Sequence, residues 1–288
     1  MPPRPHEAVE STIERTQARP TPLVRAYDAP VQPVPSRHAP SRIPLAVLRR
    51  IRRPVAATVQ LGPLAADAAV AVVIPVLDEA AALPGVLSEL RAAGLGDVVV
   101  VDGGSRDGTP ELAREAGARV VVELRRGYGR ACAAGVAATD APIIAFLDGD
   151  GSDDPAYLAE LVETVRSGRA ALALGVRTDR EHGALLLHQR LGNALVATLV
   201  RALYGTRLRD VPPLRVVRRD VLEPMDMQEM TYGWPTEMVV KAARAGLPIV
   251  QLEVRARARR GGSSKVAGRL GPSLAAGVRM LAVVFRHA

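Results

Sequence analysis

Four carboxylates fall within seven residues directly after an apolar run, and this cluster is the clearest chemical feature of the sequence. The run is 143–147 (IIAFL), and it is followed by Asp148, Asp150, Asp153 and Asp154. Like charges at the end of a buried strand are unfavourable unless a cation neutralises them. The spacing Asp148-Gly149-Asp150 places two carboxylates close enough to share a hard divalent ion such as Mg²⁺ or Mn²⁺. An acidic surface turn is the alternative.

Three further loops carry polar residues where apolar runs end. Residues 75–79 read PVLDE, residues 102–109 read DGGSRDGT, and residues 125–130 read RRGYGR. Asp102 could accept hydrogen bonds from a ribose or a base, and the glycines beside it allow a ligand to approach the backbone closely. Arginines on a Gly-rich loop that opens a helix suit an anion. Helix capping by Asp78, an ordinary turn and a solvated basic loop are the respective alternatives.

The elements that must position these loops alternate along the chain. Strands are expected at 70–75, 97–101, 119–123, 143–147 and 170–174, and helices at 78–93, 110–116, 130–138, 155–166, 191–203 and 270–285. Short connections between such units predict an α/β fold with a mostly parallel sheet flanked by helices. Ligands of such sheets bind beyond the carboxyl ends of the strands, where the four loops would meet.

The first 68 residues differ from the rest in composition. They hold 12 of the 23 prolines, and their charge is strongly positive. Such a segment buries too little apolar surface to offset its ordering entropy, so we expect a Pro- and Arg-rich disordered arm over 1–68 and one folded domain over 69–288. Residues 42–59 mix five arginines with Leu, Val and Ile. A basic amphipathic segment on anionic lipid and a solvated linker both remain open there.

Overall composition excludes several classes of protein. The chain has 288 residues, a net charge of +8 and 48% hydrophobic residues, which is ample for a buried core. The single cysteine, Cys132, excludes an internal disulfide and a Cys-based zinc cluster. Aromatic residues make up only 3%, which argues against stacking on nucleic acid. We expect neither a transmembrane helix nor a secretory signal, and therefore a cytoplasmic protein, with peripheral contact at the inner face of the plasma membrane left open.

Taken together, the loops resemble those of glycosyltransferase family 2, whose inverting members have the GT-A fold. Residues 75–79 look like the nucleotide-binding start of that family. Residues 102–109 look like its DDGSxDGT turn, with Gly103 in place of the second Asp, and residues 148–150 look like its DxD metal motif. The resemblance implies an enzyme that uses a nucleotide-diphosphate sugar and Mg²⁺ or Mn²⁺.

Two later segments narrow the resemblance. Residues 232–241 (YGWPTEMVVK) and 259–265 (RRGGSSK) are similar to the second half of polyprenyl- and dolichyl-phosphate mannosyltransferases. The similarity covers about residues 70–282, so the N-terminal arm lies outside it. The acceptor implied by this narrower group is a polyprenyl phosphate.

The resemblance also implies the residues of the site. Asp148 and Asp150 would hold the metal ion. The donor would be bound by Pro75, Asp78, Glu79, Asp102, Gly104, Ser105, Arg130, Asp148, Gly149 and Ser264. The catalytic groups would be Asp150, Glu237, Arg259 and Lys265. Within that group Glu237 would lie beside the sugar or the acceptor, whereas Arg259 and Lys265 would grip phosphates. Asp210 and Arg215 would lie below the acceptor site.

The implied activity is inverting transfer of a hexose from GDP-mannose or UDP-glucose to a polyprenyl phosphate. A phosphate acceptor is already an anion, so it needs cationic positioning and a stabilised leaving nucleotide rather than a strong base. The same chemistry on a small soluble acceptor, such as a glycerate derivative, is one alternative. A non-catalytic nucleotide-sugar sensor is another. A nucleotidyltransferase is disfavoured. Such enzymes usually have a Gly-rich, Arg-containing loop after the first strand, and residues 75–79 contain no glycine.

Overall fold

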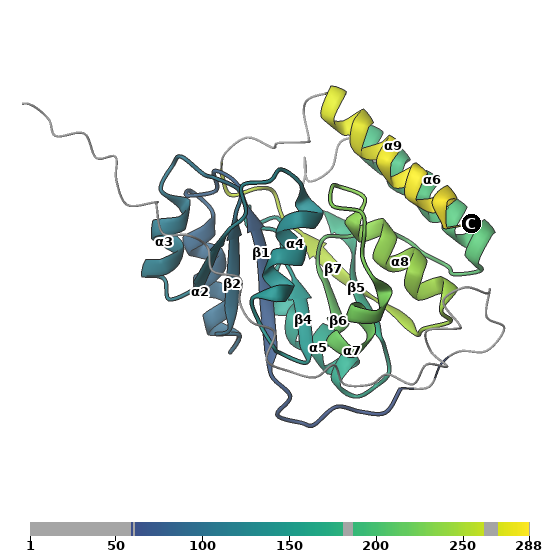
Figure 1. The fold of residues 1–288 in the computed structure, drawn as a ribbon, viewed down its shortest axis with the longest axis horizontal. Coiled ribbons are helices and arrows are strands. Elements are labelled where there is room, and N and C mark those ends of the chain that lie inside the picture. The colour runs from purple at the N-terminus through teal and green to yellow at the C-terminus, as the bar shows by residue number, and fades with distance from the viewer. Residues whose placement is uncertain (1–58, 60, 181–186, 262–269, 288) are drawn as a thin grey trace, which may run out of the picture. The chain divides into compact units, whose positions relative to one another are not determined.

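A seven-stranded sheet with the strand order β3-β2-β1-β4-β6-β5-β7 forms the centre of the structure (Figure 1). The structure is a computed structural model, and it describes residues 59, 61–180, 187–261 and 270–287. The strands are β1 (Val70–Val76), β2 (Val98–Asp102), β3 (Arg119–Val122), β4 (Ile143–Phe146), β5 (Leu172–Arg180), β6 (Arg215–Arg218) and β7 (Ile249–Ala256).

The pairing of the strands confirms the mostly parallel sheet. β1 pairs in parallel with β2 and β4, β2 pairs in parallel with β3, and β5 pairs in parallel with β7. The short strand β6 is antiparallel to both of its neighbours, β4 and β5. Parallel alignment therefore brings the carboxyl ends of β1, β2 and β4 to one edge of the sheet, as the sequence predicts.

Helices cover both faces of the sheet. They are α2 (Leu83–Ala92), α3 (Thr109–Glu115), α4 (Tyr128–Ala137), α5 (Leu158–Arg166), α6 (Leu187–Tyr204), α7 (Arg219–Leu222), α8 (Trp234–Arg244) and α9 (Leu270–Arg286), with single 3₁₀ turns η1 (Pro155–Tyr157) and η2 (Glu223–Met225). The helix expected from residue 78 begins only at Leu83. Residues 78–80 instead bind the loop after β2, since the backbone N–H of Asp78 donates to Ser105 Oγ at 2.8 Å.

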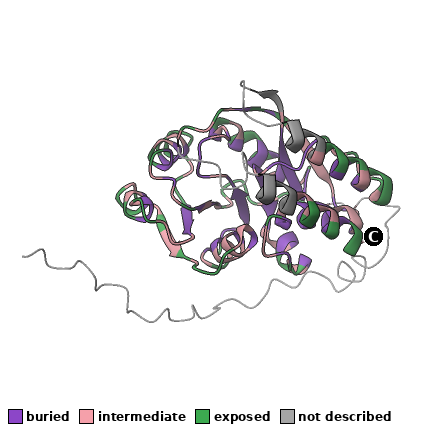
Figure 2. Cartoon of the chain, turned by 90° about the horizontal axis from the view of Figure 1, so that it is seen from above, coloured by how far each residue is buried: buried purple, intermediate pink, exposed green. Residues whose placement is uncertain are grey.

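Alternation along β1 divides the core into two layers. Val73 packs into a cluster with α4, α8 and α9, whereas Val72 and Ile74 pack into a second cluster with α2, α3 and α5. Figure 2 shows the buried residues concentrated in the strands and on the inward sides of the helices. Because Val, Ile, Ala and Leu make up most of the sheet, it is covered on both faces without many aromatic side chains.

Helices α6 and α9 lie side by side over α8 (Figure 1). Val283 and Val284 of α9 are fully buried, so the last helix packs on the core, while Val278 and Phe285 on its other side are exposed. No helix within the described ranges is both long and apolar enough to cross a membrane.

The described chain starts before the domain boundary expected at residue 68. The N–H of Val59 donates to the carbonyl of Gly246 at 2.8 Å, and the N–H of Leu64 donates to the carbonyl of Arg166 at 2.8 Å. Residues 1–58 and 60 lie outside the described residues, so the disordered arm stays a prediction.

Candidate functional site

The loops after β1 and β2 are joined into one surface. Asp78 adopts a left-handed backbone with φ of 50°, which turns its side chain toward the loop after β2. Its Oδ1 accepts from the N–H of Arg106 at 2.9 Å, and the N–H of Glu79 donates to Thr109 Oγ1 at 2.9 Å. The expected donor-binding residues of both loops are therefore brought together by short polar contacts.

Asp102 shapes the turn in which it lies. It is only 3% exposed, and its Oδ2 accepts from the N–H groups of Gly104 at 2.9 Å and Ser105 at 3.1 Å. Gly104 has φ of +90°, a conformation that favours glycine. The N–H of Gly103 donates to the Val76 carbonyl at 2.9 Å, so the tip of the turn is held against β1. A contact between Asp102 and a nucleoside stays a prediction.

The carboxylates after β4 lie close together at the same edge. The hydroxyl of Tyr128 donates to Asp148 Oδ1 at 3.2 Å, and the N–H of Asp148 approaches Asp153 Oδ2 at 3.4 Å. Asp150 Oδ1 accepts from the N–H of Ser152 at 2.9 Å. A Cβ on Gly149 would lie 2.6 Å from Val76 Cγ1, so the position between the two aspartates admits only glycine without a shift.

Burial and like charge perturb this cluster. Burial raises the pKa of Asp148 to about 8, and the charges of Asp153 and Asp150 add to that increase. Burial also raises the pKa of Asp153 to about 6, while the nearby Arg177 opposes the increase. Carboxylates with raised pKa values in a strand-end cluster are typical of functional sites, because a bound cation would relieve the repulsion.

The side chains at this edge of the sheet supply only part of the oxygen ligands that a hard cation needs. Among the described residues, no group of three or more His, Cys, Asp and Glu side chains is arranged to hold a metal ion. Asp148 and Asp150 supply carboxylate oxygens, which Mg²⁺ and Mn²⁺ prefer, and such ions commonly complete their shells with water and substrate phosphates. The pair is thus suited to an ion that arrives with a diphosphate.

Arg259 connects the loop after β1 with the acidic cluster after β4. One Nη donates to Glu79 Oε1 and the other to Asp150 Oδ2, both at 2.6 Å. Its neighbour Arg260 donates its backbone N–H to the Asp150 carbonyl at 3.1 Å. The sequence predicts separate roles for Glu79, Asp150 and Arg259, and the structure brings the three side chains into one contiguous group.

A second layer of charge lies against the acidic cluster. Arg177 of β5 forms a bidentate pair with the buried Asp210, at 2.7 and 3.0 Å. The charges of Asp210, Asp153 and Asp148 raise the pKa of Arg177 against the opposing effect of its burial. Arg215 is fully buried, and that burial lowers its pKa while the nearby Asp148 and Asp153 oppose the change. These arginines balance part of the negative charge of the cluster.

At the start of α4, where the sequence predicts an anion site, two backbone N–H groups already have partners. The N–H groups of Gly129 and Arg130 donate to the carbonyls of Thr231 and Met230, at 3.2 and 3.1 Å. Arg125 pairs with Glu123 at 2.6 Å. These two N–H groups are therefore not available to an anion, because a distant segment of the chain caps the helix, and an anion site formed by the arginine side chains stays a prediction. Binding of the donor by the Arg130 side chain stays a prediction.

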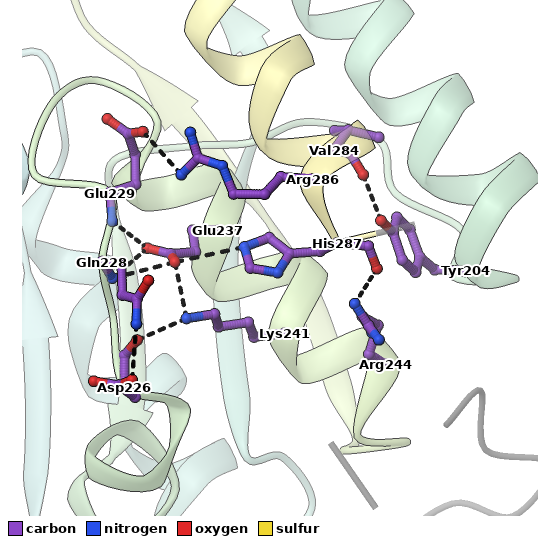
Figure 3. A network of polar contacts seen from close by, with 10 residues as sticks. All are labelled: Tyr204, Asp226, Gln228, Glu229, Glu237, Lys241, Arg244, Val284, Arg286 and His287. Atoms are coloured by element: carbon purple, nitrogen blue, oxygen red, sulfur yellow. Dashed lines mark hydrogen bonds and ion pairs between the residues drawn. The ribbon is translucent and has the colours of Figure 1, made fainter. Parts of the chain in front are cut away.

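Glu237 lies inside a buried network rather than on an open surface (Figure 3). Its side chain is fully buried, and its oxygens accept from the N–H groups of Gln228 and Glu229 at 3.0 and 2.7 Å. Lys241 Nζ pairs with it at 2.8 Å, and His287 Nε2 lies 3.6 Å away. Burial and then the charge of Lys241 lower the pKa of His287.

Some residues of the site are not predicted by the sequence pattern, and others lie outside the described residues. Tyr128 donates to Asp148, and the charge of Arg177 acts on Asp153, although neither residue was predicted for the site. Arg177 follows the buried start of β5, so strand-end placement was the signal that could have found it. Ser264 and Lys265 lie outside the described residues, and their expected phosphate contacts stay predictions.

A mostly parallel sheet whose strand-end loops gather an aspartate pair, a Gly-rich turn and a bridging arginine defines a GT-A-like glycosyltransferase. The chain belongs to this class, since the family model described as "Glycosyl transferase family 2" matches residues 71–225. An uncharacterised glycosyltransferase of Mycobacterium tuberculosis is 38% identical over 212 residues, which cover 72% of this chain and 94% of that protein.

Two relatives with more specific names are also similar. A dolichyl-phosphate hexose transferase of Haloferax volcanii is 32% identical over 194 residues, covering 66% of this chain and 84% of the relative. An undecaprenyl-phosphate mannosyltransferase of Micrococcus luteus is 31% identical over 214 residues, covering 68% and 86%. The family expected from the motifs is thereby confirmed.

A solved structure supports the fold. Glucosyl-3-phosphoglycerate synthase from Mycobacterium tuberculosis, in complex with Mn²⁺ and UDP-glucose, has a TM-score of 0.63 and 25% identity, covering 77% of this chain and 79% of that one. The same enzyme in complex with phosphoglyceric acid has a TM-score of 0.62 at 25% identity, with coverage of 77% and 80%. The protein is an enzyme, a hexosyltransferase of family 2 with a GT-A-like fold.

Proposed function

We propose that the protein transfers a hexose, with inversion, from a nucleotide-diphosphate sugar to a polyprenyl phosphate. The observation that carries the proposal is the group in which Arg259 spans Glu79 and Asp150 at 2.6 Å each, beside Asp148. This group combines carboxylates for a cation with a guanidinium for phosphate, which are the two requirements of transfer from a diphosphate to an anionic acceptor. Relatives that act on dolichyl and undecaprenyl phosphate favour the lipid acceptor.

The donor would lie over the loops after β1, β2 and β4. We propose that Pro75, Asp78, Glu79, Asp102, Gly104, Ser105, Arg130, Gly149 and Ser264 bind it. Asp148 and Asp150 would hold Mg²⁺ or Mn²⁺, and the ion when bound would neutralise charge that develops on the leaving diphosphate. Tyr128, which donates to Asp148 at 3.2 Å, would fix the orientation of that carboxylate.

The acceptor needs alignment rather than deprotonation. One of its phosphate oxygens forms the new bond to the anomeric carbon while the bond from that carbon to the diphosphate oxygen breaks. We propose that Arg259, with Lys265, holds the acceptor phosphate in line for this displacement. Arg259 would then exchange one of its carboxylate partners for phosphate, which its planar fork of N–H groups suits. To reach a lipid acceptor, the protein must contact a membrane surface. The proposal therefore includes a cytoplasmic protein that contacts the membrane peripherally.

A small soluble acceptor is the second candidate. The observation that favours it is the structural similarity to glucosyl-3-phosphoglycerate synthase in complex with phosphoglyceric acid. The same arginine and the same carboxylates would serve either acceptor, because both present a phosphate. The two candidates therefore differ in where the product partitions.

A label-partition assay tests the proposal. Purified protein with Mn²⁺ or Mg²⁺ is given labelled GDP-mannose or UDP-glucose, with polyprenyl phosphate in one arm and 3-phosphoglycerate in another. We expect label to enter the organic phase in the first arm. Label that becomes incorporated only in the second arm would establish the soluble acceptor instead.

Substitutions at the metal pair complete the test. Asp148→Ala and Asp150→Ala are expected to abolish transfer, whereas Asp140→Ala, at an exposed position in the turn before β4, is the matched control and should leave it unchanged. Undiminished transfer in both site variants would refute the assignment of the metal ligands.

A further inference from the structure

We propose that Glu237 is a positioning residue for Asp148, acting through the segment 226–233 and the first turn of α4. The inference rests on the proposed function, which gives Asp148 its role at the donor diphosphate. It assigns to Glu237 a role at a distance, in place of the direct contact with sugar or acceptor that the sequence analysis expected. The steps that connect the two carboxylates are all hydrogen bonds between described residues.

The first step fixes the segment 226–233 to α8. Glu237 accepts from the backbone N–H groups of Gln228 and Glu229, at 3.0 and 2.7 Å (Figure 3). Lys241, one turn further along α8, pairs with Glu237 at 2.8 Å and donates to the carbonyl of Asp226 at 2.7 Å. One buried ion pair thus holds three successive points of a segment that has no regular secondary structure of its own. A buried carboxylate with these donors is well satisfied and therefore rigid.

The second step attaches this segment to α4. The carbonyls of Met230 and Thr231 accept from the N–H groups of Arg130 and Gly129, at 3.1 and 3.2 Å. These N–H groups belong to the first turn of α4 and have no partner within the helix. The fit is close, because a Cβ on Gly129 would lie only 2.3 Å from the Glu229 carbonyl oxygen. The segment therefore serves as an external cap that sets where α4 begins.

The third step reaches the acidic cluster. Tyr128 is the first residue of α4, and its hydroxyl donates to Asp148 Oδ1 at 3.2 Å. A helix moves as a rigid unit, so a displacement of its capped first turn carries the tyrosine hydroxyl with it. Loss of a hydrogen-bond partner of a metal-ligating carboxylate commonly lowers metal affinity by about tenfold or more. Loosening the Glu237 anchor should therefore weaken cation binding at Asp148.

The test measures Mn²⁺ binding and does not depend on turnover. Mn²⁺ is titrated into the full chain in the presence of UDP or GDP, and the free ion is followed by electron paramagnetic resonance. Glu237→Gln, Tyr128→Phe and Gly129→Ala are each expected to raise the Mn²⁺ dissociation constant by about tenfold. The controls are Glu253→Gln, at an exposed carboxylate of β7, and Gly277→Ala, where an added Cβ meets nothing within 4 Å. Both controls should bind Mn²⁺ as the wild type does.

Gly129→Ala separates positioning from a general loss of structure. It pushes the segment away from α4 but leaves the ion pair of Glu237 with Lys241 within α8 in place. Trp234, the only tryptophan, starts α8 and packs edge-on against Phe146 with ring centroids 6.5 Å apart. Unchanged Trp234 emission together with weakened Mn²⁺ binding is the expected signature in Gly129→Ala.

A double-mutant cycle tests whether the residues lie on one path. If Glu237 acts through Tyr128, the double variant should lose no more Mn²⁺ affinity than the more affected single variant. Additive losses of Mn²⁺ affinity in the double variant would overturn the proposal. A fall in kcat for Glu237→Gln with unchanged Mn²⁺ affinity would also overturn it, because that result is expected if Glu237 contacts the reactants directly. A wild type that binds Mn²⁺ with neither nucleotide would refute the metal site of the proposed function as well. Wild-type binding with unaffected variants would refute the positioning role alone.

Discussion

Asp153 is expected to destabilise the metal-free protein above about pH 6. It is 3% exposed, lies against Asp148, and has its pKa raised from 3.8 to about 6 by burial. A raised pKa means that the folded protein binds this proton more tightly than the unfolded chain. The stability contributed by the proton is therefore complete below pH 3.8 and is lost as the pH rises through about 6. Asp148, with its pKa raised to about 8, extends the loss toward pH 8.

Asp153→Asn removes the charge and keeps the shape. The difference between 3.8 and about 6 corresponds to about 3 kcal/mol, at about 1.4 kcal/mol for each pKa unit. The amide oxygen can still accept from the N–H of Asp148. We therefore expect Asp153→Asn to raise the free energy of unfolding by up to about 3 kcal/mol at pH 8. For a domain of this size that corresponds to an increase in Tm of roughly 6–12 °C, and the gain should be clearly smaller at pH 5.

Urea unfolding with excess chelator, followed by Trp234 fluorescence at pH 5 and pH 8, measures the effect. Asp140→Asn, at an exposed position, controls for the chemistry of the substitution. The wild type should be less stable at pH 8 than at pH 5, and Asp153→Asn should remove much of that difference. A wild type equally stable at both pH values, with no gain in the variant, would refute the argument that buried like charges dominate this cluster.

Three further substitutions test the packing of the core, the Arg177–Asp210 ion pair and the contacts of Arg259 with two carboxylates. Gly135→Ala would place a Cβ 2.3 Å from Val73 Cγ1, so overpacking between α4 and β1 should cost about 1–3 kcal/mol in urea unfolding. Arg177→Met leaves the buried carboxylate of Asp210 without its bidentate partner and should cost about 3–5 kcal/mol, measured in the same way. Arg259→Lys keeps the charge but cannot span two carboxylates, so kcat/KM for the donor should fall about tenfold or more in steady-state assays. Unchanged values in any of the three would contradict the contact on which that prediction rests.

Local patterns were sufficient for much of the fold. The β-branched runs that became β1, β2 and β4 are continuous and short, and each is buried on both faces. Strand direction follows from the helical crossovers between them, so the edge at which the loops meet was predictable. For the same reason the order of strands and loops along the chain is enough to place Asp148 and Asp150 beside the loops of Glu79 and Asp102.

Local sequence patterns did not predict the structure of segments that are held by contacts with distant parts of the chain. Helix α2 begins at Leu83, because the residues from Asp78 onward bind the loop after β2. Two backbone N–H groups in the first turn of α4 donate to segment 226–233, a contact that the local sequence does not indicate. The antiparallel strand β6 lies between β4 and β5, which no periodicity in four residues could indicate.

The sequence by itself determined the chemical groups and the strand ends that carry them, since residue type and short-range periodicity are local properties. The tertiary structure decided which of these groups meet. Arg259 reaches Glu79 across 180 residues of chain and Asp150 across 109. Glu237, with the same acidic character as Glu79, is enclosed by backbone N–H groups and Lys241 instead. Hydrogen bonds and ion pairs act over a few ångströms, so only packing of the whole chain settles which carboxylate lies among the strand-end loops and which is enclosed in the scaffold.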